Sequence, residues 1–289
     1  MRSRSSSLLV IVSAVTALVA SAAIPDRARG GDDHDHELPE APMAGVPHRV
    51  LHFTFDDGPR ELVTPRILRA LRQYDVKATF FVITRVLENP RRRRRARALL
   101  RRIAEEGHAV ELHGHHHDDF REMSEEELTE QLRHSARLIE EVTGRGPRLV
   151  RPPFGAHDAR VDQLLARLGY DQVLWAMAPE PAGVREQEVV VDTFRAQLDE
   201  REGSRLPGAV VVLHDSRPWV GDAFPRIMRV VKRRNCQLWL HGAELWDVVP
   251  TFEALRPTEE EVEARQAVLR EQSRRYCPRY GREYARGPR

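Results

Sequence analysis

The sequence predicts an α/β fold: a (β/α) barrel, incomplete or distorted, built on a parallel sheet. Apolar strand-like segments alternate along the chain with amphipathic helical segments, and intervening helices let successive strands run parallel. At 289 residues the chain is long enough to bury a large core. Because active sites of such barrels lie at the C-terminal ends of the strands, functional residues are expected just after each predicted strand.

Two hydrophobic periods locate the elements: alternation predicts strands, and apolar residues three and four apart predict helices. One helix begins with Ser124 and Glu127 in capping-box spacing, and another stops at Gly107. Strands are expected at residues 49–55, 78–83, 109–112, 148–150, 171–177, 208–215 and 236–240, and helices at 64–75, 93–107, 124–144, 158–168 and 188–201.

The N-terminus has the pattern of a secretory signal. Arg2 and Arg4 precede an apolar stretch that ends in the small residues Ala20, Ser21 and Ala22. An uncleaved membrane anchor is the alternative, although the stretch is short for a span. No later segment is long and apolar enough to cross a bilayer, so an exported protein is expected (periplasmic, cell-envelope or secreted). The expected organisation is a signal peptide at 1–23, a flexible linker at 24–46, a folded domain at 47–250, and a charged C-terminal helix and tail at 251–289.

The charge balance gives no sign of nucleic-acid binding, because 46 basic residues face 44 acidic ones. The arginine run at 91–95 begins a helix, where the helix dipole disfavours positive charge. It could bind an anionic glycan, or it could form a solvated charged face.

Two cysteines stand near the C-terminal end of the chain. Export makes it possible that Cys236 and Cys277 pair, and two unpaired thiols are the alternative. We predict a disulfide that joins the C-terminal helix to the last strand.

Polar residues follow four different predicted strands. Asp56 and Asp57 end the first, and the segment that begins at His113 follows the third. Arg151 follows the "RLV" strand, and His214 ends "AVVVL". His113 and His117 stand four apart, so a helical turn would present both imidazoles on one face, as a chelating pair requires. Each group alone also has a purely structural interpretation; their coincidence at strand ends favours a metal-dependent site.

These motifs resemble those of the polysaccharide deacetylases (carbohydrate esterase family four). The first motif, T-F-D-D-G-P, stands unaltered at residues 54–59, and H-x-x-x-H matches "HGHHH" at 113–117. The third motif appears as "RPPFG", with Phe154 where Tyr is usual, and the fifth appears as "VLHD" at 212–215. The resemblance spans about residues 47–248, which makes residues 47–250 the expected deacetylase catalytic domain.

The resemblance implies roles for nine residues. Asp57, His113 and His117 would hold one divalent metal ion, with Zn²⁺ expected and Co²⁺ or Ni²⁺ also compatible. Asp56 would be the general base, and Arg151 would keep it ionised and oriented. His214 would protonate the leaving amine. Substrate contacts would come from the backbone N–H of Phe154 and from the apolar side chains of Val212 and Leu213.

The fourth motif is missing in its usual form, since Ala178 stands where relatives have the Asp that pairs with the His here numbered 214. Without a carboxylate partner the pKa of His214 should be lower, which predicts a weakened enzyme. Glu180 could replace the Asp if the loop bends, although Pro179 and Pro181 restrict it.

The expected function is removal of N-acetyl, or O-acetyl, groups from a polysaccharide such as peptidoglycan, chitin-like chains or exopolysaccharide. The partners expected are this acetylated substrate and no nucleic acid, with no membrane span after signal cleavage, and the protein is expected to be a monomer. Alternatives are a hydrolase of small-molecule amides and a non-catalytic module that binds glycan or cell wall.

Overall fold

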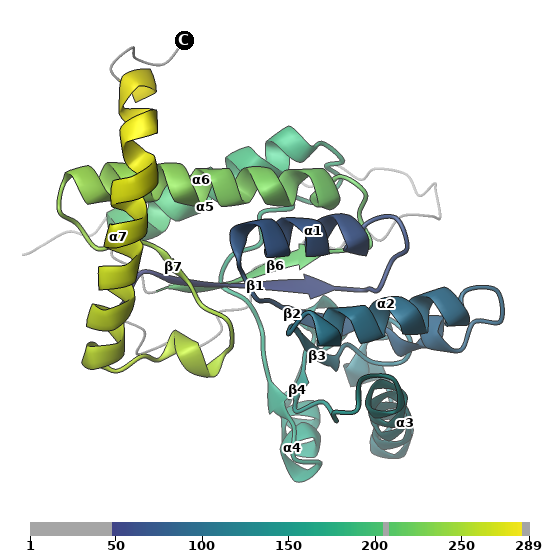
Figure 1. Ribbon diagram of the computed structural model, residues 1–289. Helices are drawn as coiled ribbons and strands as arrows, with labels where there is room; N and C mark the ends of the chain where they lie inside the picture. Colours follow the sequence, from purple (N-terminus) through teal and green to yellow (C-terminus); the bar gives the residue numbers. More distant parts are fainter. Residues whose placement is uncertain (1–47, 205–207, 285–289) are drawn as a thin grey trace, which may run out of the picture. The chain divides into compact units, whose positions relative to one another are not determined.

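A curled parallel sheet forms the centre of the computed structural model, which describes residues 48–204 and 208–284 (Figure 1). Its strands pair in the order β5-β4-β3-β2-β1-β6, and β7 pairs with the start of β1. The strands are β1 (Val50–Asp56), β2 (Thr79–Val82), β3 (Ala109–Leu112), β4 (Leu149–Val150), β5 (Asp171–Gln172), β6 (Ala209–His214) and β7 (Asp247–Val248). All the pairings are parallel, and the predicted incomplete barrel is confirmed.

The segment 171–177 brings the two edges of the sheet together. Asp171 and Gln172 pair with β4, whereas Met177 forms a parallel bridge with Val211 of β6. The continuous strand predicted for 171–177 is therefore wrong, because only Asp171 and Gln172 form a strand and only Met177 forms a further bridge. The chain bends between them, because the carbonyl groups of Val173 and Leu174 accept hydrogen bonds from a buried arginine instead of a neighbouring strand.

Helices cover one face of the strands, and their apolar sides form the main core. Strand β1 shows the division, since Leu51, Phe53 and Phe55 pack into that core while the residues between them face the inside of the curl. Helices α1, α5 and α6 lie along this side of β1 and β6 (Figure 1). The helices are α1 (Thr64–Tyr74), α2 (Arg93–Glu105), α3 (Glu125–Thr143), α4 (Ala159–Arg167), α5 (Gln187–Ser204), α6 (Val220–Leu240) and α7 (Glu259–Tyr284), with 3-10 turns η1 (Thr84–Leu87), η2 (Phe120–Glu122), η3 (Pro153–Gly155) and η4 (Glu253–Leu255).

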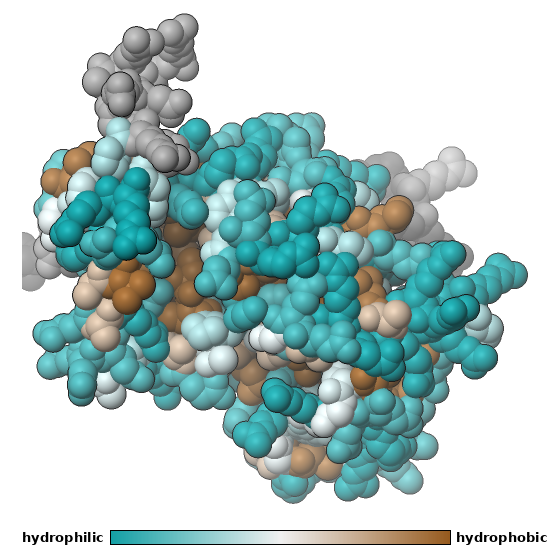
Figure 2. Space-filling view, viewed as in Figure 1, coloured by the Kyte–Doolittle hydropathy of each residue, from teal (hydrophilic) through white to brown (hydrophobic). Residues whose placement is uncertain are grey.

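Local sequence signals set several helix ends. Helix α3 begins with the predicted capping box between Ser124 and Glu127, and it ends at Gly144 in the left-handed conformation. Arg91–Arg95 lie at the start of α2 and are exposed, and the surface over this helix is strongly hydrophilic (Figure 2). Arg95 forms an exposed ion pair with Glu61. Both expectations for the run, glycan binding or a solvated face, remain predictions.

The expected signal peptide (1–23) and linker (24–46) lie outside the described residues, as do residues 285–289 of the expected C-terminal tail. No helix in the described ranges combines the length and the apolar character that a membrane span requires.

The strand predicted at 236–240 is wrong, because these residues form the last turn and a half of α6. Alternation of apolar and polar residues over so short a segment resembles a strand. The longer pattern upstream has helical spacing: Phe224, Ile227 and Val231 are buried on one side of the same helix. Helical periodicity over 21 residues outweighs a five-residue alternation.

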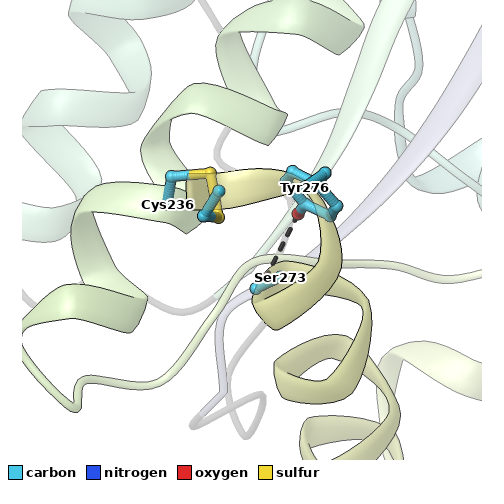
Figure 3. The surroundings of a disulfide bond; sticks show 4 residues. Cys236, Ser273 and Tyr276 are labelled. Atoms are coloured by element: carbon cyan, nitrogen blue, oxygen red, sulfur yellow. Dashed lines mark hydrogen bonds between the residues drawn. A yellow bond between two sulfur atoms is a disulfide. The ribbon is translucent and has the colours of Figure 1, made fainter. Parts of the chain in front are cut away.

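Cys236 and Cys277 form a disulfide, which confirms the predicted pairing. It joins α7 to α6 and not to a strand, as Figure 3 shows, because Cys236 lies within α6. Both cysteines are buried. Close to the disulfide, the hydroxyl groups of Ser273 and Tyr276 on α7 form a hydrogen bond with each other (Figure 3).

Reduction of this disulfide should lower the free energy of unfolding. The cysteines are 41 residues apart, and closing a loop of this length contributes roughly 3–4 kcal/mol through the entropy of the unfolded chain. Urea unfolding with and without reductant measures the loss, and the Cys236→Ser/Cys277→Ser variant should match the reduced protein. Two reactive thiols per chain in unfolded, unreduced protein would contradict the pairing.

A buried arginine links the inner faces of the strands. The Arg151 side chain is fully buried, and its Nη1 donates to Asp56 Oδ1 at 2.7 Å and to Thr54 Oγ1 at 2.8 Å. Its Nε and Nη2 donate to the carbonyl groups of Val173 and Leu174, both at 3.2 Å. Arg151 thus holds β1, β4 and the bent segment 171–177 in one hydrogen-bonded unit.

Removal of Arg151 should be strongly destabilising. Arg151→Leu leaves the buried carboxylate of Asp56 without its partner, and a broken buried pair costs about 3–5 kcal/mol. Urea unfolding provides the measurement. The matched control is Arg167→Leu, which removes an exposed ion pair with Glu125 and should cost less than about 1 kcal/mol. Equal losses of unfolding free energy in the two variants would show that the buried pair contributes no more to stability than the exposed one.

Candidate metal-dependent active site

The predicted site residues converge at the C-terminal ends of the strands. Asp56 ends β1, where it is paired in register with His214 at the end of β6. His113 follows β3, and its N–H donates to the carbonyl of Val82 at the end of β2. Arg151 follows β4. The parallel register thus brings residues far apart in the sequence to one edge of the sheet.

Asp57 lies between two imidazoles. Its Oδ1 is 3.5 Å from Nε2 of His113 and 3.5 Å from Nε2 of His117, and the three ligand atoms lie within 4.8 Å of one another. This Oδ1 is buried and has no hydrogen-bond partner among the described residues, whereas Oδ2 accepts from Ser216 at 2.9 Å. A buried carboxylate oxygen without a donor, facing two imidazole nitrogens, is suited to a metal cation.

The two histidines do not share a helical turn, so that expectation is wrong. Residues 113–117 form an irregular loop with Gly114 at φ 87°, a conformation favourable for glycine. His113 is fixed by its Nδ1, which donates to the Arg151 carbonyl at 2.7 Å and leaves the Nε2 lone pair toward Asp57. The ring of Phe154 packs edge-on against His117, with centroids 4.3 Å apart.

The ionisation of Asp57 and His117 suits metal binding. Burial raises the pKa of Asp57, but the nearby histidines and the Ser216 hydrogen bond outweigh it and lower the pKa to about 2. Burial and the neighbouring His113 lower the pKa of His117. At neutral pH the cluster therefore offers an anionic carboxylate and a neutral imidazole, the forms in which these groups bind metals.

The turn after β1 separates the roles of its two carboxylates. Asp57 has φ 75°, in the left-handed region that Asp tolerates better than most residues, so its side chain diverges from that of Asp56. Gly58 follows because a Cβ there would lie 2.1 Å from the Asp215 carboxylate. Asp215 is itself fully buried against Thr64, and burial raises its pKa to about 7.

His214 has a carboxylate partner, which corrects the expectation that the altered fourth motif leaves it without one. Glu180 Oε1 lies 3.0 Å from His214 Nδ1 and accepts the His214 backbone N–H at 2.7 Å. Burial lowers the pKa of His214, but the charge and the hydrogen bond of Glu180 outweigh it and raise the pKa to about 9. The expected lowering of this pKa is therefore wrong. Arg217 holds the other oxygen of Glu180 at 3.3 Å.

Three residues that support this centre had no role predicted from the sequence: Thr54, which begins the first motif, Ser216 and Arg217. Ser216 and Arg217 directly follow the "HD" motif, so their position next to a motif was the available signal. Val212 and Leu213 are both buried, in apolar clusters on opposite sides of the sheet. Their expected substrate contacts remain a prediction.

Comparison with known proteins gives the family context. The family model described as "Polysaccharide deacetylase" matches residues 44–173. The peptidoglycan-N-acetylglucosamine deacetylase PgdA of Listeria monocytogenes is 32% identical over 180 residues, which are 62% of this chain and 35% of PgdA. This chain thus spans about a third of that relative.

Two further proteins match over most of their own length. A chitooligosaccharide deacetylase of Bradyrhizobium sp. (strain ANU 289) is 33% identical over 172 residues, which are 59% of this chain and 72% of that protein. The structure of the peptidoglycan deacetylase PdaC from Bacillus subtilis is 29% identical with a TM-score of 0.56, and the match covers 80% of this chain and 98% of that one. With its fold and four motifs in order, this chain belongs to the polysaccharide deacetylase family.

Proposed function

We propose that this chain is an exported, metal-dependent hydrolase that removes N-acetyl groups from a polysaccharide, with peptidoglycan or chitin-like chains as the substrate class. The observation that carries the proposal is the cluster of Asp57, His113 and His117 beside a second carboxylate, that of Asp56. Relatives named peptidoglycan and chitooligosaccharide deacetylases support an acetylated glycan as the substrate.

Asp57, His113 and His117 would hold the metal ion. Two imidazole nitrogens and one carboxylate oxygen suit Zn²⁺, with Co²⁺ or Ni²⁺ also compatible. Asp57 Oδ1 is buried and accepts no hydrogen bond from the described residues, and the Nδ1–H of His113 is fixed; both observations support this choice of ligands. When bound, the metal supplies Lewis acidity, which acidifies water and polarises the acetyl carbonyl.

Asp56 acts as the general base in the proposed reaction. Its Oδ1 is held by Arg151, which leaves Oδ2 to accept a proton from the attacking water. The fully buried guanidinium pairs with the carboxylate and holds it in one orientation. The water oxygen bonds to the acetyl carbon as its proton passes to Asp56.

His214 acts as the general acid. Its Nδ1–H donates to Glu180, so Nε2 carries the second proton of the imidazolium and can give it to the leaving nitrogen. The carbon–nitrogen bond then breaks, and acetate and a free amine leave. The backbone N–H of Phe154 would stabilise the oxyanion. Val212, two residues before His214 on the same side of β6, would border the acetyl methyl group, whereas Leu213 packs into the core on the other side of the sheet.

Acetate release from acetylated chitooligosaccharide and peptidoglycan, by protein loaded with Zn²⁺, tests the function. The wild type should release acetate. Asp56→Asn should retain its metal and lose at least about a hundredfold in kcat, because the base is gone while the ligands remain. Asp57→Ala should lose both the metal of this site and turnover.

Asp162→Ala is the matched control, because Asp162 also pairs with a histidine but lies on the surface of α4. It should behave as the wild type. Unchanged turnover in Asp56→Asn, or loss of metal from it, would overturn the division of roles. Binding of the glycan without any acetate release would instead favour the alternative of a non-catalytic binding module.

Glu180→Gln should weaken the enzyme and move the high-pH limb of its rate profile. Glu180 raises the pKa of His214, so the imidazolium persists through neutral pH and is lost only as the pH rises through the raised value. Without the charge that pKa falls, so we expect the limb to shift down by about one unit and kcat to drop about tenfold at pH values above the raised pKa.

Glu244→Gln provides the control, since Glu244 contacts His48 at 3.3 Å in another part of the domain. Its profile should match that of the wild type. A Glu180→Gln profile that also matches would show that His214 needs no carboxylate.

A further inference from the structure

A second group of metal-binding side chains lies beside the histidine loop. Glu88 follows η1, His115 lies between His113 and His117 in the loop, and His134 is on α3. Nε2 of His134 is 3.0 Å from Glu88 Oε2, and Nε2 of His115 is 3.5 Å from the same oxygen. The three ligand atoms lie within 4.8 Å of one another. The loop thus alternates: His113 and His117 contact Asp57, whereas His115 contacts Glu88.

His115 is held in the form that a metal ligand requires. The buried hydroxyl of Thr84 donates to Ser135 at 2.9 Å, so it accepts the Nδ1–H of His115, also at 2.9 Å. The proton on Nδ1 leaves the lone pair of Nε2 on the side of Glu88. The backbone of His115 is fixed as well, because its N–H donates to Gln131 and its carbonyl accepts from Arg85.

The second imidazole, that of His115, distinguishes this group from an ordinary surface ion pair between a histidine and a carboxylate. His157 and Asp162 form such a pair at 2.8 Å, with exposure similar to that of Glu88 and His134. No group of three His, Cys, Asp or Glu ligands that contains His157 or Asp162 was found in the described ranges. What distinguishes Glu88 and His134 is the second imidazole, only 16% exposed and oriented by Thr84.

The surroundings leave room for further ligands. Glu88 also lines a surface pocket of about 520 Å³ together with Leu87, Arg93, Arg94 and Arg97. The guanidinium groups oppose a cation, but Arg97 is engaged by the Leu87 carbonyl and by Glu141. Because Glu88 borders this pocket, water or a small anion from solvent can reach the Glu88 side of an ion held by the three side chains.

We propose that Glu88, His115 and His134 bind a second divalent transition-metal ion, such as Zn²⁺, which braces the loop that carries His113 and His117. The ion replaces the proton that joins His134 Nε2 to Glu88 Oε2. It then links the end of η1 and helix α3 to His115 in the middle of the loop, two residues from both His113 and His117. Two imidazoles and a carboxylate are donors that Zn²⁺ accepts.

Equilibrium dialysis of the full chain against Zn²⁺ tests the site. His134→Ala and Glu88→Gln should each bind one equivalent less than the wild type, and they should retain the equivalent that Asp57→Ala loses. Glu88 is exposed, His134 is half-buried, and both lie outside the loop, so the variants should leave the first site intact. Any Zn²⁺ bound by His34 and His36 is the same in the wild type and in all the variants, so only differences in Zn²⁺ content between proteins are compared. His157→Ala is the matched control and should bind as much Zn²⁺ as the wild type.

Zn²⁺ contents of His134→Ala and Glu88→Gln equal to that of the wild type would overturn the proposal. This test also separates the second site from the proposed function. If only Asp57→Ala loses an equivalent of Zn²⁺, the second site is contradicted and the first is not. If only His134→Ala and Glu88→Gln lose one, the first site is contradicted and the second is not. Hydrogen exchange tests the bracing. Zn²⁺ should slow exchange of the 113–117 amides in Asp57→Ala but not in Asp57→Ala/His134→Ala, and no slowing in either would contradict it.

Discussion

The buried ion pair between Arg151 and Asp56 is the interaction on which the rest of the site depends. Two adjacent carboxylates at a strand end repel each other and lose hydration, so they need positive partners. Arg151 supplies one, fully buried and hydrogen-bonded to Asp56 at 2.7 Å. The same side chain donates hydrogen bonds to the carbonyl groups of Val173 and Leu174. One residue therefore holds both the bend that closes the curled sheet and the orientation of the Asp56 carboxylate.

The second carboxylate is provided for differently. Asp57 turns away at positive φ, toward His113 and His117, and its Oδ1 has no hydrogen-bond donor among the described residues. In the proposed mechanism this division lets one aspartate hold the metal while the other accepts a proton. The environment of each carboxylate, and not its identity, separates the two roles, as is usual for paired acids in hydrolases.

Much of this arrangement could be predicted because its signals are local. The motif at residues 54–59 contains both the end of β1 and the turn that carries Asp57, and the capping box that begins at Ser124 needs only four residues. The contact of Glu180 with His214 spans 34 residues and depends on how the loop bends between two prolines, so the sequence could only offer it as an alternative. The end of α6 was mistaken for a strand because five residues hold too little of the helical period to reveal it.

Anomalous diffraction from crystals grown with Zn²⁺ is the most direct measurement of the division between the two aspartates. We expect an ion bound by Asp57 Oδ1 and by Nε2 of His113 and His117 at about 2.0–2.2 Å, with Asp56 off the metal and still paired with Arg151. An ion bound by Asp56, or a site between β1 and the histidine loop that stays empty in saturating Zn²⁺, would contradict it.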